Sequence, residues 1–178
     1  MDEHDLFLSS NLKPAHAGLP PTGLMSVTAI LLLTLAAYAY AATDTCAMVA
    51  PEDFSKAFGE AFGPPARVAT PAGPLAGPMV VCTYKSKTLE LTIASYEYLT
   101  AAKSASNWNI RRTRDLATRH AVDLPGVGES AYYMRFTVQS HQGIHDYNFS
   151  LVPSGASANK DWKDPLVSIA KLFYSRLR

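Results

Sequence analysis

Four stretches of the chain predict β-strands: apolar and polar residues alternate along three of them, and the fourth is a short apolar run. Leu89, Leu91 and Ile93, for example, would share one face of a strand, with the polar residues between them on the other face. One-sided alternation of this kind is typical of antiparallel sheets. The predicted strands are Met79–Tyr84, Thr88–Tyr96, Ala131–Gln139 and Ile144–Val152.

Apolar residues recur at helical spacing in three further stretches. Pro51 and Pro165 would each stand at a first helical position, where a missing N–H costs no hydrogen bond. Residues 64–78 are rich in proline and glycine, which predicts an irregular, partly extended loop. The predicted helices are Pro51–Phe62, Tyr98–Arg119 and a last helix that begins at Pro165 after its cap, Asp164.

The order of these elements is α-β-β-α-β-β-α. It predicts an α+β fold in which an antiparallel four-stranded sheet carries helices packed on one face. Residues 42–178 are enough for a single domain of this kind, with one core.

The N-terminal quarter has a different character. No Asp, Glu, Lys or Arg occurs from Pro14 to Thr43, and Leu24–Ala42 is almost entirely apolar. Small residues at Ala39 and Ala41 match the positions that signal peptidase requires, so we expect residues 1–41 to be removed by cleavage after Ala41. Cleavage after Ala39 or Ala42 is a close alternative. An uncleaved membrane anchor over residues 24–42 is the rival interpretation, and Met25 is an alternative start.

Composition supports a folded and mildly basic exported part. The chain of 178 residues is 48% hydrophobic and 17% charged, which excludes a wholly disordered protein. Residues 42–178 hold 15 basic and 12 acidic residues, too small an excess to indicate a nucleic-acid partner by itself. Membrane contact is expected only through the signal peptide or an uncleaved anchor.

The two cysteines, Cys46 and Cys82, both lie in the exported part. In an oxidising compartment a single pair is most simply explained as one disulfide. Two cysteines without histidines at ligand spacing do not predict a structural zinc site. We therefore expect a disulfide and no cofactor.

Catalytic patterns are weak in this chain. His141, His145 and Asp146 are the best cluster of potential metal ligands, but they flank a predicted hairpin turn, where polar residues are common. The segment 126–131 fits the dinucleotide pattern GxGxxA, yet a strand is predicted after it, where that pattern requires a helix. No nucleophile elbow occurs, and Ser130 would need a His and an acid supplied by the fold. We expect a protein that is not an enzyme.

A candidate interaction surface combines arginine with aromatic residues, which are the types that anchor protein interfaces. The alternative is a solvated helix face together with ordinary core aromatics. The residues of this candidate surface are Tyr96, Tyr98, Trp108, Arg111, Arg112 and Arg114.

Several of these elements occur together in one known group of proteins. Cys46 precedes the first helix, Cys82-Thr83-Tyr84 lies in a strand, Gly126-Val127-Gly128-Glu129-Ser130-Ala131 precedes another strand, and an amphipathic helix closes the chain. This layout resembles small exported bacterial proteins with a Cys pair, many of uncharacterised function. Its helix-hairpin order is also similar to small periplasmic inhibitor and assembly modules. The resemblance implies an action through a presented surface and brings no catalytic residues.

The sequence therefore predicts a non-enzymatic binding domain, periplasmic or secreted, with a protein partner in the cell envelope. Its sharpest form is an inhibitor or immunity-type protein that acts on an envelope enzyme. An accessory protein in envelope assembly or structure is the alternative. A small hydrolase with a site at His141, His145 and Asp146 is the second alternative.

Overall fold

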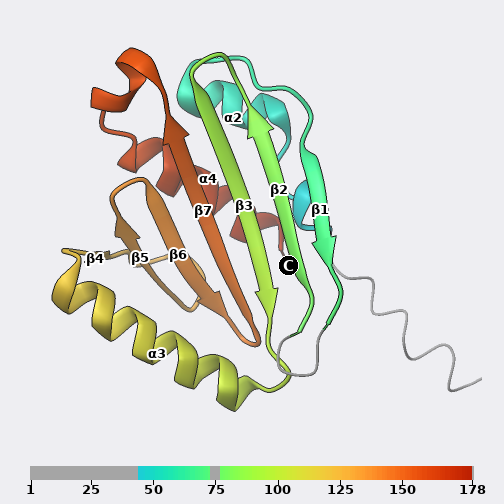
Figure 1. Ribbon diagram of the computed structural model, residues 1–178, viewed down its shortest axis with the longest axis vertical. Helices are drawn as coiled ribbons and strands as arrows, with labels where there is room; N and C mark the ends of the chain where they lie inside the picture. Colours follow the sequence, from blue (N-terminus) through green and yellow to red (C-terminus); the bar gives the residue numbers. More distant parts are fainter. Residues whose placement is uncertain (1–43, 73–76, 178) are drawn as a thin grey trace, which may run out of the picture. The chain divides into compact units, whose positions relative to one another are not determined.

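Seven antiparallel strands form one sheet in the computed structural model, which describes residues 44–72 and 77–177 (Figure 1). Across the sheet the strands follow the order β1-β2-β3-β7-β6-β5-β4, so that β3 and β7 are central neighbours. The strands are β1 (Ala66–Thr70), β2 (Met79–Lys85), β3 (Leu89–Glu97), β4 (Val122–Asp123), β5 (Ser130–Met134), β6 (Thr137–Gln142) and β7 (His145–Pro153).

The described residues also form three α-helices. The last one begins at Lys163 after Trp162, so the predicted start at Pro165 with Asp164 as its cap is wrong. Pro51 opens α2, and Gly59 ends it in a left-handed conformation, four residues before the predicted end. Thr100 caps α3 by accepting a hydrogen bond from the N–H of Lys103. The helices are α2 (Pro51–Phe58), α3 (Ala101–Thr118) and α4 (Lys163–Arg176), and two 3-10 helices are η2 (Thr45–Ala47) and η3 (Gly155–Asn159).

The hydrophobic core lies between α2, α4 and one face of the sheet, here called the core face. Neighbouring strands place Ile93, Phe149 and Val138 side by side on this face. Phe149 packs edge-on against Phe173 of α4, with ring centroids 5.3 Å apart. All four side chains are fully buried, and burial of this size supplies about 1.5–3 kcal/mol per side chain.

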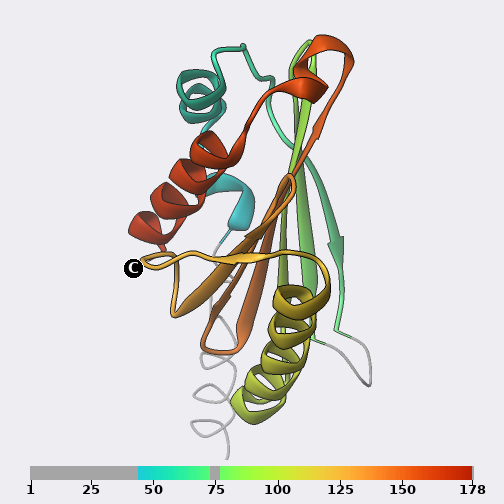
Figure 2. The ribbon, with the colours of Figure 1, turned by 90° about the vertical axis from the view of Figure 1, so that its left-hand side faces the viewer.

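The predicted arrangement with every helix on one face is wrong, because α3 lies on the opposite face of the sheet (Figure 2). Its Trp108 packs against Tyr132 and His141, whose positions alternate with those of the core-face residues on β5 and β6. The side of α3 that touches the sheet is mostly polar. The sequence of α3 therefore lacks the apolar stripe that would show which side of the helix faces the sheet.

The prediction of four strands is also wrong, for three local reasons. The segment Ala131–Gln139 is two strands, because Arg135 takes a left-handed conformation with φ 52° and turns the chain between β5 and β6. All five residues of β1 are exposed, so no alternation marks it within the proline-rich loop. The third missed strand, β4, has only two residues.

The predicted disulfide is confirmed. Cys46 and Cys82 are joined with an S–S distance of 2.00 Å, which ties η2 to β2 within the core. Next to it, the Tyr84 hydroxyl donates a hydrogen bond of 2.7 Å to the carbonyl oxygen of Cys46. Burial raises the pKa of Tyr84 to about 12. A disulfide of this kind is compatible with a location outside the cytoplasm.

The N-terminal predictions fall outside the described residues. These are the cleavage positions Ala39 and Ala41 and the apolar run Leu24–Ala42. Within residues 44–72 and 77–177, no helix has both the length and the apolar character needed to cross a bilayer.

Candidate functional site

In the described part of the chain, no helix covers one half of the face that carries α3. The cross-strand row Val68, Val81 and Ala94 runs over β1, β2 and β3 on this side, and Val152 of β7 points the same way. Val68 and Val152 are each 61% exposed, although valine is most often buried. We call these four residues, with the neighbouring Tyr96, the open face.

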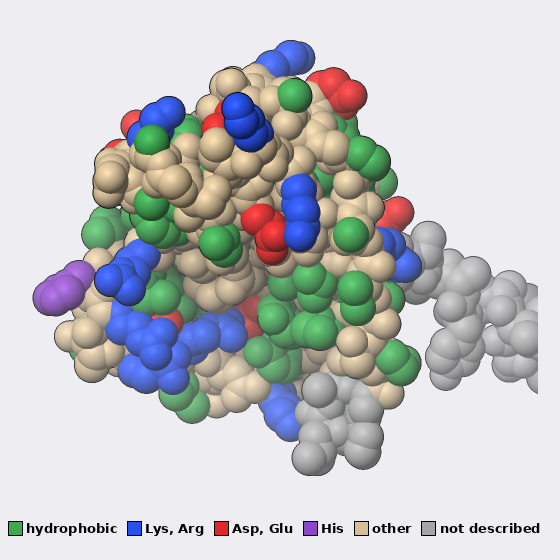
Figure 3. Space-filling model, turned by 45° about the horizontal axis from the view of Figure 1, so that its top comes forward, with side chains coloured by type: hydrophobic (Ala, Val, Ile, Leu, Met, Phe, Trp, Pro, Cys, Tyr) green, Lys and Arg blue, Asp and Glu red, His purple; other side chains and the backbone are tan. Residues whose placement is uncertain are grey.

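Cationic side chains border the open face. Figure 3 shows hydrophobic side chains gathered on this side of the molecule and, apart from them, a dense group of Lys and Arg side chains. The arginines belong to α3 and its C-terminal cap, Arg119. An apolar surface and a basic surface therefore lie on the same side of the sheet.

Beneath α3, buried polar groups join the helix to the sheet. The Arg111 guanidinium donates to Asp146 at 2.5 Å, and Asp146 also contacts Nδ1 of His141 at 2.8 Å. One helical turn further on, the Tyr132 hydroxyl donates to Asp115 at 2.7 Å. We call this set of five residues the polar seam.

Hydrogen bonds favour the charged forms of Asp115 and Arg111 in the polar seam. Burial alone would raise the pKa of Asp115, but hydrogen bonds from Tyr132 and Arg114 outweigh it and lower that pKa below its ordinary value. Burial likewise opposes the charge on Arg111, yet its contact with Asp146 raises the pKa of the guanidinium. The pKa of Tyr98 is raised by burial and by the charge of Asp146. The seam thus holds fixed opposite charges that position α3.

The structure brings the predicted surface residues together around α3 but exposes only some of them. Trp108 is 3% exposed and packs in the helix-sheet interface, with the Arg111 guanidinium 5.3 Å above its ring. Tyr98 and Arg111 are partly buried beside Asp146. Arg112 is partly buried as well and pairs with Asp123, so the exposed members are Tyr96 and Arg114.

The predicted cluster of His141, His145 and Asp146 comes together only in part. His141 and Asp146 are hydrogen-bonded on the α3 side, whereas His145 lies on the core-face side of β7, with its ring 6.0 Å from that of Tyr147. No group of three His, Cys, Asp or Glu residues in the described part of the chain could hold a metal ion.

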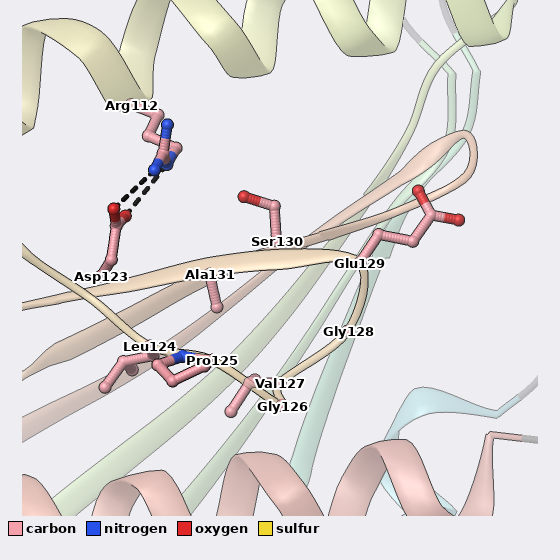
Figure 4. A pocket seen from close by; sticks show the side chains of 10 residues that line it. All are labelled: Arg112, Asp123, Leu124, Pro125, Gly126, Val127, Gly128, Glu129, Ser130 and Ala131. Atoms are coloured by element: carbon pink, nitrogen blue, oxygen red, sulfur yellow. Dashed lines mark hydrogen bonds and ion pairs between the residues drawn. The ribbon is translucent and has the colours of Figure 1, made fainter.

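A pocket of about 420 Å³ lies at the β4–β5 end of the sheet (Figure 4). Its lining includes the segment 126–131 and the ion pair of Arg112 with Asp123. Strand β5 follows the glycines, so the segment 126–131 does not lead into the helix N-terminus that dinucleotide binding requires. Gly128 has φ 56°, and a Cβ there would lie 2.8 Å from the carbonyl oxygen of His141. The conformation of the turn and this close approach therefore account for glycine at this position.

Ser130 also lines this pocket and is the cross-strand neighbour of His141, which in turn neighbours Asp146. Among the described residues no hydrogen bond joins Ser130 to His141. The carboxylate of Glu129 lies 4.0 Å from Nε2 of His141 instead. Ser130, His141 and Asp146 therefore lie side by side on neighbouring strands but lack the hydrogen bonds of a nucleophilic site.

Sequence reasoning singled out Tyr96 of the open face and Asp146 of the polar seam, but it missed the other residues of the open face and the buried position of Asp115. Val68 lies in a strand that shows no alternation, and Val152 was assigned to a strand without regard to its outward side. Only knowledge of which helices cover which face would have identified these residues as uncovered.

Comparisons of the chain with protein-family models, with curated proteins and with solved structures found no match.

Proposed function

We propose that this chain is a non-enzymatic binding domain that works outside the cytoplasm, periplasmic or secreted, and binds a protein partner in the cell envelope. The open face is the observation that carries the proposal. Among the described residues, Val68, Tyr96 and Val152 stay exposed on β1, β3 and β7, while α2 and α4 bury the other face. The disulfide supports a place of action in an oxidising compartment.

The sharper form of the proposal is an inhibitor or immunity-type protein that blocks an envelope enzyme. A preformed sheet surface suits such a role, because binding then costs little conformational entropy. An accessory role in envelope assembly is the alternative, and it predicts that the chain stays with a large envelope complex during fractionation.

The hydrolase alternative is favoured by one observation, the 2.8 Å contact between His141 and Asp146. A carboxylate on Nδ1 can orient the ring of a general base. Incubation of the purified chain with a fluorophosphonate probe and with zinc tests this alternative. Neither labelling at Ser130 nor zinc retention is expected, and either result would favour the hydrolase.

The test of the binding proposal uses the full chain, tagged at its C-terminus and isolated gently from the envelope and culture fluid of its own cells. Native mass spectrometry should find an oxidised chain with a second protein attached. Val152→Asp should weaken that association strongly, because it places a charge on the open face.

Ser168→Asp is the control. Ser168 is exposed on α4, at the other face of the sheet and away from α3, so a negative charge placed there should leave the association intact. A bare oxidised monomer, or equal effects of the two substitutions, would contradict the proposal.

A further inference from the structure

The charge of the exported part is concentrated on α3. From Ala101 to Arg119 there are five cationic residues and one acidic residue, Asp115. This excess of four positive charges is larger than the net charge of +3 for residues 42–178, so the remainder is slightly acidic. The molecule is therefore polarised, with its positive side at one helix.

Two of the three acids that pair with the arginines of α3 lie inward, whereas Asp123, the partner of Arg112, is exposed. Asp115 and Asp146 are almost fully buried beneath the helix. Arg114 and Arg119 share the single carboxylate of Asp115, at 3.0 and 3.6 Å, while about half of each arginine side chain stays in solvent. An approaching partner thus meets guanidinium groups, and a shared carboxylate cannot neutralise both of them.

Apolar side chains continue from the open face to the start of α3. Tyr96 of the open face lies near the end of β3, and Leu99, 59% exposed, lies in the link between β3 and α3. The open face and the basic helix are consecutive in the chain, joined through Tyr98, which is anchored by its N–H to the carbonyl oxygen of Ile144. The two surfaces are therefore adjacent and fixed relative to each other.

We propose that the partner is an acidic protein that contacts both surfaces, with apolar side chains on the open face and carboxylates on α3. This inference rests on the proposed function and names the chemistry of the same site. Charge complementarity selects acidic groups. The apolar half favours a protein over a highly charged envelope polymer, because such a polymer has little apolar surface to cover Val68, Tyr96 and Leu99.

The experiment compares two charge reversals in the full chain, isolated from its own cells as above. Lys103→Glu changes an exposed cation of α3, and Lys171→Glu makes the same change on α4, at the other face. The first should weaken the complex by about fivefold and the second should leave it unchanged. Raising NaCl from 0.1 to 0.5 M should weaken the wild-type complex by a similar factor.

Two outcomes would overturn this inference alone. One is a complex that Val152→Asp disrupts but that neither Lys103→Glu nor salt weakens, which would leave the binding proposal standing. The other is binding to phosphatidylglycerol vesicles, but not phosphatidylcholine vesicles, as strong as binding to the protein partner, which would assign α3 to an anionic membrane. Absence of any complex would overturn both proposals.

Discussion

Asp115 shows how single buried carboxylates attach α3 to the sheet. It accepts a hydrogen bond from Tyr132 at 2.7 Å and lies 3.0 Å from Arg114, although its side chain is almost fully buried. The contribution of such a carboxylate depends on its charge. Because the folded-state pKa lies below the ordinary value, the stabilisation is complete above pH 4 and is lost as the pH falls through the folded-state pKa.

Asp115→Asn should lower the free energy of unfolding by about 2 kcal/mol at pH 7, because a charge-assisted hydrogen bond is lost. The difference from wild type should shrink as the pH falls below about 4. Urea titration at pH 7 and pH 3 measures both effects. Asp123→Asn is the control, since Asp123 pairs with Arg112 in solvent and should contribute less than about 1 kcal/mol. A difference that persists unchanged at pH 3 would contradict this account.

At the residue scale the sequence predicts the cysteine pairing and much of the core but not the polar seam. Cys46 and Cys82 have no other partners in the chain, so counting suffices. Trp108 and Arg111 were expected on an interaction surface, yet Arg111 belongs to the seam and Trp108 packs against two of its residues. Their partners Tyr132, His141 and Asp146 lie on three different strands, and local spacing holds no information about that register.

Strand ends and turns are the elements where the sequence was least informative. The strands β2, β3 and β7 lie within one residue of their predicted bounds, because each has alternating apolar residues on the core face. The β5–β6 turn was missed because Arg135 takes a left-handed conformation there without glycine. The helix α3 was placed correctly along the chain but on the wrong face.

Gly77 fixes the start of β2 at the element scale. A Cβ at this position would overlap the carbonyl oxygen of Glu97, the last residue of β3, so the two backbones require glycine to lie this close. Gly77→Ala should cost about 1–3 kcal/mol of stability by forcing the backbones apart. A thermal unfolding curve followed by circular dichroism measures the loss.

Gly63→Ala is the matched change for this prediction. A Cβ at Gly63 would lie 3.9 Å from the carbonyl oxygen of Lys85, an ordinary contact, and its φ is not in the left-handed region. Its melting temperature should equal or slightly exceed that of wild type, because alanine reduces the entropy of the unfolded chain. Equal losses at both positions would contradict the steric explanation.

At the scale of the whole molecule the disulfide is the main covalent constraint on residues 42–178. It joins residues 36 positions apart and spans α2 and β1. Closing a loop of this length in the unfolded chain corresponds to about 4 kcal/mol in the chain-entropy model.

Reduction should therefore lower the free energy of unfolding by about 2–5 kcal/mol, measured by urea titration with and without dithiothreitol. The double variant Cys46→Ala/Cys82→Ala should match the reduced wild type and should not respond to the reductant. A reduced chain as stable as the oxidised one would show that burial alone holds η2 against β2.

The strand order has a consequence for how the chain reaches its folded state. Strands β1–β3 form one local meander and β4–β7 another, and the two meet only where β7 pairs with β3. That central pairing joins residues about sixty positions apart, and such distant contacts form late because loop closure must come first. Until β3 and β7 pair with each other, each of them is an edge strand with one side unpaired. A chain that crosses a membrane unfolded, N-terminus first, would therefore expose a half-sheet on the far side before its second half can complete it.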